Sequence, residues 1–337
     1  MKTTDFAIHL SNFINKYIVT QKNLSTNTIS SYCTTFKLFI IFISNTKCIS
    51  AEKIKLSDIT VSTVRGFLNW IETERKNGIS TQNQRLAAIH AFFRYLMIEM
   101  PGELLKCQQI LSIPFKKQPK PLVNHFDKES LEILLRQPNP NTLYGLRDIT
   151  LMSLMYDTGA RVQEIIDLKV ADIRLEKPAV VTLVGKGRKS RCVPILPQTA
   201  ELIKTYLIQM KLTNPENLCN NLFTNHSKEP LTRAGIGYIL NKYLKQAQKT
   251  HKGMPEKTSP HCLRHTKAMH LMQSEINMVY IRDFLGHSSV MATEIYARTD
   301  SELKRKALEK AYSPINNTET SWEQDRDLMD WLSEMCK

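Results

Sequence analysis

The sequence predicts a mainly α-helical protein with a small antiparallel β-sheet or hairpin, divided between two domains. Three observations lead to this prediction. Apolar residues recur at helical spacing through the first hundred residues, two β-branched segments flank a basic turn, and a run of prolines and lysines separates the two regions. The 337 residues, 42% of them hydrophobic, suffice for two domains with apolar cores and exclude a wholly disordered chain.

The N-terminal region, residues 1–112, is expected to form a bundle of four helices. Its apolar stripes place large side chains every three or four residues, at 6–17, 29–40, 64–71 and 86–96. Ser25 can cap the start of the second helix, and Gly78 can cap the end of the third. Several amphipathic helices joined by short loops are typical of a small bundle.

Residues 113–123 read IPFKKQPKPLV and are expected to form a basic, proline-rich linker. Three prolines and three lysines without periodicity favour an extended connection over a helix or strand. Lys116, Lys117 and Lys120 are candidates for contacts with a DNA backbone, although a merely solvated linker is equally compatible with this composition.

Residues 124–314 are expected to form a mixed domain. The predicted helices fall at 131–135, 146–156, 200–210, 234–247, from 261 onward, and at 303–311. The predicted strands fall at 179–184 and 192–196. Between them, GKGRKSR forms the tip of a basic hairpin, whose Arg188, Lys189 and Arg191 are further candidates for DNA contacts.

The net charge of +14 is unevenly distributed along the chain. Residues 1–115 carry +6, residues 317–337 carry −4, and the stretch between them carries +12. Two basic segments followed by an acidic tail suggest that the first two bind a polyanion such as double-stranded DNA, while the tail binds protein.

Targeting signals and cysteine motifs are not evident. The longest apolar run is far shorter than the ~20 residues of a membrane span, and the N-terminus lacks a signal-peptide core, so an intracellular, cytoplasmic protein is expected. The seven cysteines are scattered and form no CxxC pair, which argues against a disulfide framework or a cysteine-rich zinc site.

Four short elements of the second region carry the residues suited to chemistry. In chain order they contain Arg161 and Glu164, then Lys186, then His261, Arg264 and His265, and finally His287 with Tyr296. Arginine forks match phosphate oxygens, histidine can donate a hydrogen bond or move a proton, and a tyrosine hydroxyl can act as a nucleophile. No cluster of metal-binding carboxylates accompanies them, so this set suits phosphoryl transfer on a diester without a metal or cofactor.

Each element alone has a simpler interpretation. The GKG sequence can be an ordinary hairpin turn, and it lacks P-loop spacing. His261 and His265 could share a helix face as metal ligands, but HCLRH has no HExxH glutamate and Arg264 would repel a cation, so no metal site is expected.

The ordered combination resembles the tyrosine recombinase family, also called phage-type integrases. The carrying motifs are TGARVQE, GKG, HCLRH and LGH, with a tyrosine nine residues after the last histidine. The resemblance covers about residues 122–312 with specific motifs, and more loosely residues 1–115, which look like the family's SAM-like core-binding domain. Departures lie at Ala297-Arg298, Lys267 and His270, and they leave the subgroup undecided.

The resemblance implies a reaction and a role for each residue. Tyr296 attacks the scissile phosphate, Lys186 protonates the leaving 5′ oxygen, and Arg161 and Arg264 hold the non-bridging oxygens. The remaining residues assist, with His261 and His287 at the phosphate, and Glu164 and His265 orienting their neighbours. It also implies a tetramer on two specific DNA sites and no cofactor.

The tail, residues 315–337, is expected to contain a hinge and an acidic amphipathic helix. Its apolar stripe consists of Leu328, Trp331, Leu332 and Met335. Such a stripe must be buried either on its own catalytic domain or on a neighbouring protomer. The hinge gives the helix reach, so we expect docking on a neighbour.

Several functions remain compatible with the sequence. The leading hypothesis is integration, excision or transposition of a mobile element by a site-specific recombinase. Chromosome-dimer resolution is the main alternative, and a type IB topoisomerase, which uses similar chemistry on one duplex, is less favoured. A DNA-binding architectural protein with a vestigial site is the non-enzymatic alternative.

Overall fold

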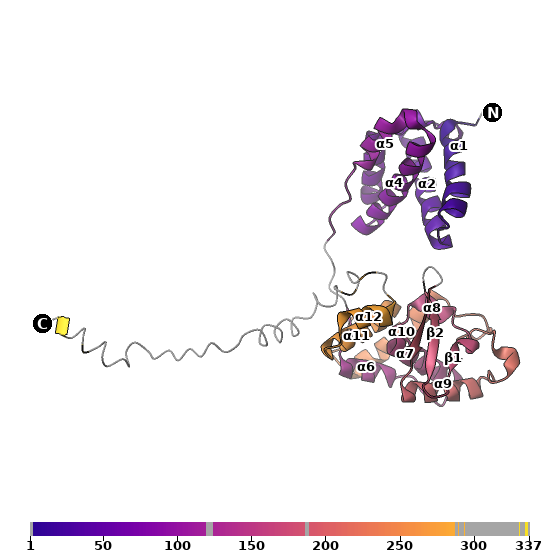
Figure 1. Ribbon diagram of the computed structural model, residues 1–337, viewed down its shortest axis with the longest axis vertical. Helices are drawn as coiled ribbons and strands as arrows, with labels where there is room; N and C mark the ends of the chain where they lie inside the picture. Colours follow the sequence, from indigo (N-terminus) through magenta and orange to yellow (C-terminus); the bar gives the residue numbers. More distant parts are fainter. Residues whose placement is uncertain are drawn as a thin grey trace. The chain divides into compact units, whose positions relative to one another are not determined.

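The computed structural model describes residues 3–118, 124–185 and 189–286, with five isolated residues beyond them. The chain divides into two compact units, Met1–Lys120 and Pro121–Lys337 (Figure 1). Five candidate residues lie outside the described residues: Lys120, Lys186, Arg188, His287 and Tyr296. The predicted helix at 303–311 and the tail also lie outside them, except for Asp330, Glu334 and Met335, which are helical and exposed.

The described part of the first unit is helical throughout. Its main helices are α1 (Asp5–Asn12), a π-helical continuation (Phe13–Gln21), α2 (Thr26–Lys47), α3 (Val61–Thr73), α4 (Ile79–Glu99) and α5 (Leu104–Leu111). Short 3₁₀ turns occupy Ala51–Lys53, Leu56–Asp58 and Pro101–Glu103. The four predicted helices are therefore present, and α5 was not predicted from the sequence.

The predicted helix caps are partly confirmed. Ser25 caps α2 by accepting a hydrogen bond from the backbone N–H of Thr28 at 3.4 Å. The prediction for Gly78 was wrong, because α3 ends before it and Gly78 is instead the extended residue that precedes α4. The left-handed backbone conformation after α3 falls on Lys76, with φ of 50°, so a glycine was not needed there.

An aromatic cluster fills the core of the first unit. Phe92 of α4 meets Phe13 and Phe36 edge-to-face, with ring centroids 5.4 and 5.3 Å apart. Tyr95 lies one helical turn further on and contacts Phe13 at 5.5 Å. Helix α4 is buried on several sides, as expected for the central helix of a bundle, and it contacts α2, α3 and α5.

The second unit combines helices with one small sheet. Its helices are α6 (Lys128–Leu135), α7 (Leu143–Thr158), α8 (Val162–Ile166), α9 (Pro197–Gln209), α10 (Arg233–Thr250), α11 (Pro260–Gln273) and α12 (Met278–Leu285). Its strands are β1 (Ile173–Arg174), β2 (Val180–Val184) and β3 (Ser190–Pro194). The strands form an antiparallel sheet in the order β1-β2-β3, which confirms the predicted mainly helical fold with a small antiparallel sheet.

The register of β2 and β3 brings the hairpin ends together. Thr182 pairs with Cys192 and Val184 pairs with Ser190, so β3 begins two residues earlier than predicted. Strand β1 was not predicted, because two residues are too short to show an alternating pattern.

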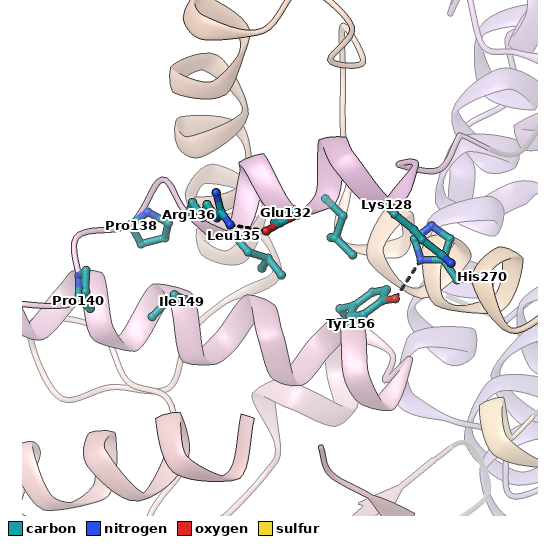
Figure 2. Close-up of a pocket in the computed structure, with 10 residues that line it drawn as sticks. Lys128, Glu132, Leu135, Arg136, Pro138, Pro140, Ile149, Tyr156 and His270 are labelled. Carbon is teal, nitrogen blue, oxygen red and sulfur yellow. Dashed lines mark hydrogen bonds and ion pairs between the residues drawn. The ribbon is translucent and has the colours of Figure 1, made fainter. Parts of the chain in front are cut away.

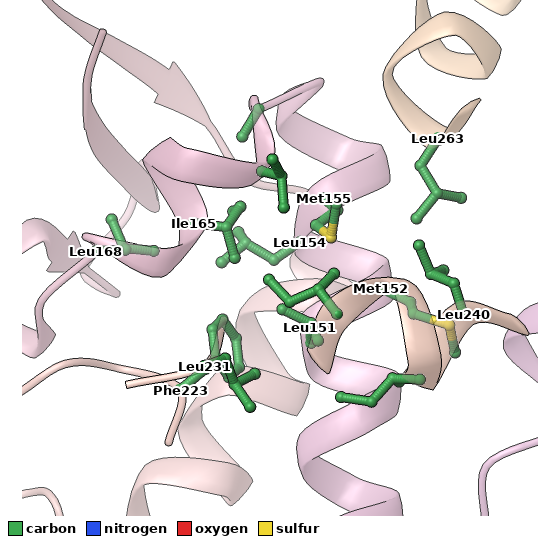
Figure 3. Packing of buried hydrophobic residues seen from close by; sticks show 14 of the residues in the cluster. Leu151, Met152, Leu154, Met155, Ile165, Leu168, Phe223, Leu231, Leu240 and Leu263 are labelled. Atoms are coloured by element: carbon green, nitrogen blue, oxygen red, sulfur yellow. The ribbon is translucent and has the colours of Figure 1, made fainter. Parts of the chain in front are cut away.

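Helix α7 is the centre of the second core. It contacts α6, α9 and α11, and Figure 3 shows its Leu151 and Leu154 among apolar side chains from α8, α10 and α11. Both leucines are fully buried. A helix surrounded in this way provides a rigid base for the residues at its C-terminal end.

Two glycines end the helices that lead into the candidate site. Gly159 follows α7 with φ of 56°, and Gly286 follows α12 with φ of 64°. This left-handed conformation favours glycine, because a side chain would be strained there. A Cβ on Gly159 would also lie 2.6 Å from Cδ2 of Leu285, so any other residue there would force the Leu285 side chain to move.

Candidate functional site

Arg161 and Glu164 form the first part of the site, at the start of α8. The Glu164 carboxylate accepts hydrogen bonds from the Arg161 backbone N–H and from its Nη1, both at 2.8 Å. The Glu164 side chain is 3% exposed, whereas that of Arg161 is 30% exposed. The buried Glu164 carboxylate therefore fixes Arg161, while the Arg161 side chain stays partly exposed to solvent. This arrangement is suitable for binding a phosphate.

Arg264 lies on α11 and is buried. Its Nη1 donates to the carbonyl oxygen of Gly159 at 2.6 Å, and its Nη2 donates to that of Leu285 at 2.8 Å. The Arg264 side chain thus joins the end of α7 to the end of α12. Both helix ends carry unsatisfied carbonyls and negative dipole character, which stabilises a cation at this place.

Three successive carbonyls at the end of α12 each accept a hydrogen bond from a different arginine. Phe284 O accepts from Nε of Arg191 at 3.1 Å, Leu285 O from Arg264, and Gly286 O from Nη2 of Arg161 at 2.8 Å. Since His287 is the next residue in the chain, these bonds fix the backbone immediately before a predicted catalytic residue.

The β2–β3 hairpin also reaches this place. A Cβ on Gly185 would lie 3.1 Å from Oε1 of Glu164 and 3.6 Å from Nη1 of Arg161. The Gly185 backbone N–H donates to the carbonyl of Lys189 at 2.8 Å and closes the base of the hairpin tip. The residue before Lys186 is therefore in contact with the arginine–carboxylate pair.

His261 and His265 lie one turn apart on α11, with ring centroids 6.4 Å apart. Desolvation, and then the charges of Arg264, Arg161 and Arg233, lower the pKa of His261. Burial, and then neighbouring positive groups, lower the pKa of His265 to about 4. Both imidazoles are therefore neutral at pH 7, and a neutral His261 can donate one hydrogen bond or accept a proton.

The two departures from the family pattern on α11 have structural partners. His270 is buried, and its Nδ1 lies 2.9 Å from Oη of Tyr156 while its Nε2 lies 3.1 Å from the carbonyl oxygen of Phe126. Nζ of Lys267 lies 4.8 Å from the centroid of the Tyr156 ring. These contacts join α11 to α7 and to the first residues after the linker.

The described DNA-contact candidates fall into two groups. Lys117 and Lys189 are exposed. Lys116 forms an ion pair with Glu72 at 2.5 Å, and its backbone exchanges two hydrogen bonds with the Asn83 side chain. Arg191 is mostly buried inside the site, where it forms an ion pair with Glu164.

The sequence predicted the residue types of the site but missed its supporting contacts. The α12 carbonyls cannot be recognised from the sequence, because any residue supplies the same backbone group. The signal that was available was Gly159 and Gly286, since a glycine after an apolar helical stripe is typical of a helix C-terminus.

Two kinds of site are absent from the described residues. No group of three or more His, Cys, Asp or Glu side chains there is arranged to hold a metal ion. Among the helices with described positions, none is long and apolar enough to cross a membrane.

Comparison with known proteins gives two family matches. Residues 124–302 match the phage integrase family, and residues 12–100 match the phage integrase N-terminal SAM-like domain. A protein of Sinorhizobium fredii named as the integrase/recombinase y4rC is 30% identical over 99% of this chain and 99% of its own length. The tyrosine recombinase XerD of Listeria monocytogenes is 29% identical over 88% of this chain and 96% of its own length.

Solved structures share the fold. The Tn1549 transposon integrase in complex with transposon right end DNA has a TM-score of 0.69 at 17% identity, covering 89% of this chain and 98% of that chain. The XerH site-specific recombinase bound to its difH substrate has a TM-score of 0.64 at 23% identity, covering 86% and 81%. With matches to both family models and a full-length relative at 30% identity, the chain belongs to the phage integrase family of tyrosine recombinases.

Proposed function

We propose that the protein is a site-specific DNA recombinase that cleaves and rejoins DNA through a 3′-phosphotyrosyl intermediate. The observation that carries this proposal is that Arg161 and Arg264 both donate to carbonyls at the end of α12, while His261 lies close enough to both arginines for their charges to lower its pKa, after desolvation. Two fixed guanidinium groups and a neutral imidazole suit the two non-bridging oxygens of a phosphodiester. XerH and the Tn1549 integrase, which share the fold, were both solved on DNA.

The reaction follows from these groups. The Tyr296 hydroxyl oxygen attacks phosphorus, and the bond to the 5′ oxygen breaks. The tyrosine proton passes to a neutral histidine, for which His261 and His287 are the candidates. Lys186, next to Gly185, gives a proton to the leaving 5′ oxygen. Arg161 and Arg264 stabilise the negative charge of the pentavalent transition state.

Reversal requires only a second 5′-hydroxyl, which attacks the phosphotyrosine and releases Tyr296. The number of phosphodiester bonds is conserved, so rejoining needs no ATP. Lys117, Lys120, Arg188 and Lys189 are proposed to contact the DNA backbone around this centre, and Lys116 is proposed to join them by exchanging Glu72 for a phosphate. An enzyme with this substrate would work on the nucleoid, in the cytoplasm.

Covalent capture tests the chemistry. The full chain is incubated with nicked duplexes that carry a randomised core, in which the short cleaved strand diffuses away and traps the enzyme. We expect a protein–DNA adduct that survives denaturation, enriches one duplex family, and is lost in Tyr296→Phe. Tyr280→Phe, an exposed tyrosine on α12, is the matched control. Absence of an adduct on every duplex would overturn the proposal in favour of an architectural protein.

The biological role is proposed to be integration, excision or transposition of a mobile element. The match with y4rC includes the acidic tail, because it extends over 99% of this chain, whereas the match with XerD extends over 88%. Capture on fragmented genomic DNA tests this role. Enrichment of element ends supports it, and enrichment of one chromosomal site per replicon supports dimer resolution instead. Relaxation of plasmids that lack the enriched sequence would favour a topoisomerase.

An apolar groove on the second unit is a suitable acceptor for the tail. A cavity of about 480 Å³ lies between α6, α7 and α11. Figure 2 shows side chains that line it, such as Leu135 and Ile149. Lys128, Arg136 and Glu132 also line it, and Arg136 forms an ion pair with Glu132. The lining therefore has one net positive charge, which complements the −4 of residues 317–337. We propose that the tail of one protomer occupies this groove on its neighbour and links four protomers on two DNA sites.

Light scattering on complexes with the captured duplex tests the docking. We expect Trp331→Ala and Ile149→Glu each to reduce the tetramer, and the double variant to be no worse than either, because both remove one contact. Unchanged assembly in both variants would overturn docking in trans and leave docking in cis. Val279→Ala, an exposed apolar residue outside the groove, serves as the control.

A further inference from the structure

Arg191, on strand β3, is held inside the protein although it belongs to the basic hairpin. Its side chain is 14% exposed. All three of its guanidinium nitrogens have partners: Nη1 and Nη2 donate to Oε1 and Oε2 of Glu164 at 2.9 and 2.7 Å, and Nε donates to Phe284 O. This fork-to-fork geometry needs a planar guanidinium, and a lysine cannot reproduce it.

Glu164 is shared between two arginines. Each of its oxygens accepts one hydrogen bond from Arg191 and one from Arg161. Burial by itself would raise the pKa of Glu164, but these hydrogen bonds outweigh it and lower that pKa, so the carboxylate is ionised. Two guanidinium groups against one carboxylate leave a net positive charge, and the more exposed Arg161 presents it to solvent.

Arg191 also shapes the turn after α12. A Cβ on Gly286 would lie 3.0 Å from Nη1 and 3.2 Å from Cδ of Arg191. The arginine therefore packs directly against the residue that precedes His287. One side chain thus joins the hairpin strand, the start of α8 and the end of α12.

We propose that Arg191 is a positioning residue for DNA cleavage: through Glu164 it fixes the Arg161 guanidinium, and through the Phe284 carbonyl and Gly286 it fixes the backbone that leads to His287. This proposal rests on the proposed function. It differs from a DNA-contact role, because both Nη groups of Arg191 already bind the Glu164 carboxylate, which takes the place that a phosphate would occupy. Without Arg191, Glu164 loses the bidentate partner that fixes the orientation of its carboxylate, and Arg161 loses its fixed orientation.

Cleavage kinetics on the captured duplex separate the two roles. We expect Arg191→Lys to lower the single-turnover cleavage rate at saturating DNA at least tenfold, with the DNA dissociation constant and its salt slope unchanged. Arg174→Lys, an exposed arginine on the same sheet, should leave the rate unchanged. An unchanged rate, or weaker binding with a smaller salt slope, would overturn the proposal, since loss of a phosphate contact reduces that slope.

A double-mutant cycle tests the path through Glu164. If both residues act by orienting Arg161, Glu164→Gln combined with Arg191→Lys should be about as slow as the slower single variant. Multiplicative losses would show independent action and contradict the proposed path. Thermal melting of each variant establishes that the rates are measured on folded protein.

A measurement without DNA keeps this inference separate from the proposed function. Carbon-13 NMR of the Glu164 carboxyl should show a higher pKa in Arg191→Lys than in the parent chain, because the bidentate hydrogen bonds are lost. The same pKa in both proteins would overturn the positioning role. If covalent capture fails while this pKa rises, the proposed function fails and the Arg191–Glu164 linkage stands.

Discussion

The two units of the molecule use buried residues in different ways. Among the described residues, the first unit buries aromatic and aliphatic side chains, and its buried polar residues, Thr35, Thr63, Gln82 and His90, include no Asp, Glu, Lys or Arg. The second unit buries five such residues: Arg147, Asp148, Asp157, Glu164 and Arg264.

The difference shows what each unit has to hold in place. Apolar packing is non-directional and suffices to maintain the shape of a helical bundle. Buried charges require exact partners, and removing one partner is strongly destabilising. In the site of the second unit, such partnered charges keep Arg161 and Arg264 in one orientation. Mutations should therefore affect stability in the first unit and, near the site, chemistry in the second.

The largest effect is expected for Arg264→Lys. Lysine keeps the charge but cannot reach both Gly159 O and Leu285 O, so one end of the site loses its support. We expect single-turnover cleavage of the captured duplex to fall roughly 10²–10³-fold. The control is Arg282→Lys on α12, where an exposed ion pair with Asp283 should tolerate the change. A loss below tenfold would mean that Arg264 acts by charge alone.

Phe92→Ala should have the next largest effect, confined to the first unit. Removing this ring empties the space between Phe13 and Phe36, and should lower the free energy of unfolding by roughly 3–5 kcal/mol. Calorimetry of the full chain should show the loss in one transition only. Phe115→Ala, at a ring that is 49% exposed, should cost far less. Equal losses at both positions would contradict the aromatic core described here.

Tyr243→Phe tests the buried charges of the second unit outside the site. The Tyr243 hydroxyl donates to Oδ2 of Asp148 at 2.9 Å, while Arg147 binds Oδ1. Losing a hydrogen bond to a charged group should lower the free energy of unfolding by about 1.5–3 kcal/mol. Tyr238→Phe, at a residue that is 72% exposed, is the matched control and should have little effect. Urea denaturation of both variants measures the difference.

Near neutral pH the smallest expected effect is that of His265, whose contribution develops only as the pH falls. Its pKa is about 4 in the folded protein and about 6.5 when unfolded, so the unfolded state binds more protons between these values. Stability should therefore decrease as the pH falls from about 6.5 to 4. His265→Gln should make this decrease shallower, because it removes the side chain that gains a proton on unfolding. Denaturant unfolding at several pH values checks the slope, and an unchanged slope in His265→Gln would contradict the contribution of this side chain.

The helices were largely predictable because their apolar stripes are long and periodic. Strand β1 and helix α5 were both missed because they are short: β1 has two residues, and α5 has only eight after the turn at Pro101-Gly102. Gly78 was misplaced because the left-handed residue after α3 is a lysine. Such local choices depend on which backbone conformation the neighbouring helices leave available.

The sequence by itself determined the helical fold with its small sheet, the family, and the residue types suited to phosphoryl transfer. These follow from periodicity and from the order and spacing of motifs, which are properties of the chain. Only the tertiary structure decided the partners of these residues. Arg191 binds Glu164 and does not face solvent, and three arginines donate hydrogen bonds to three successive carbonyls. The physical reason is that backbone carbonyls are the same in every residue, so only folding determines which of them accept an arginine.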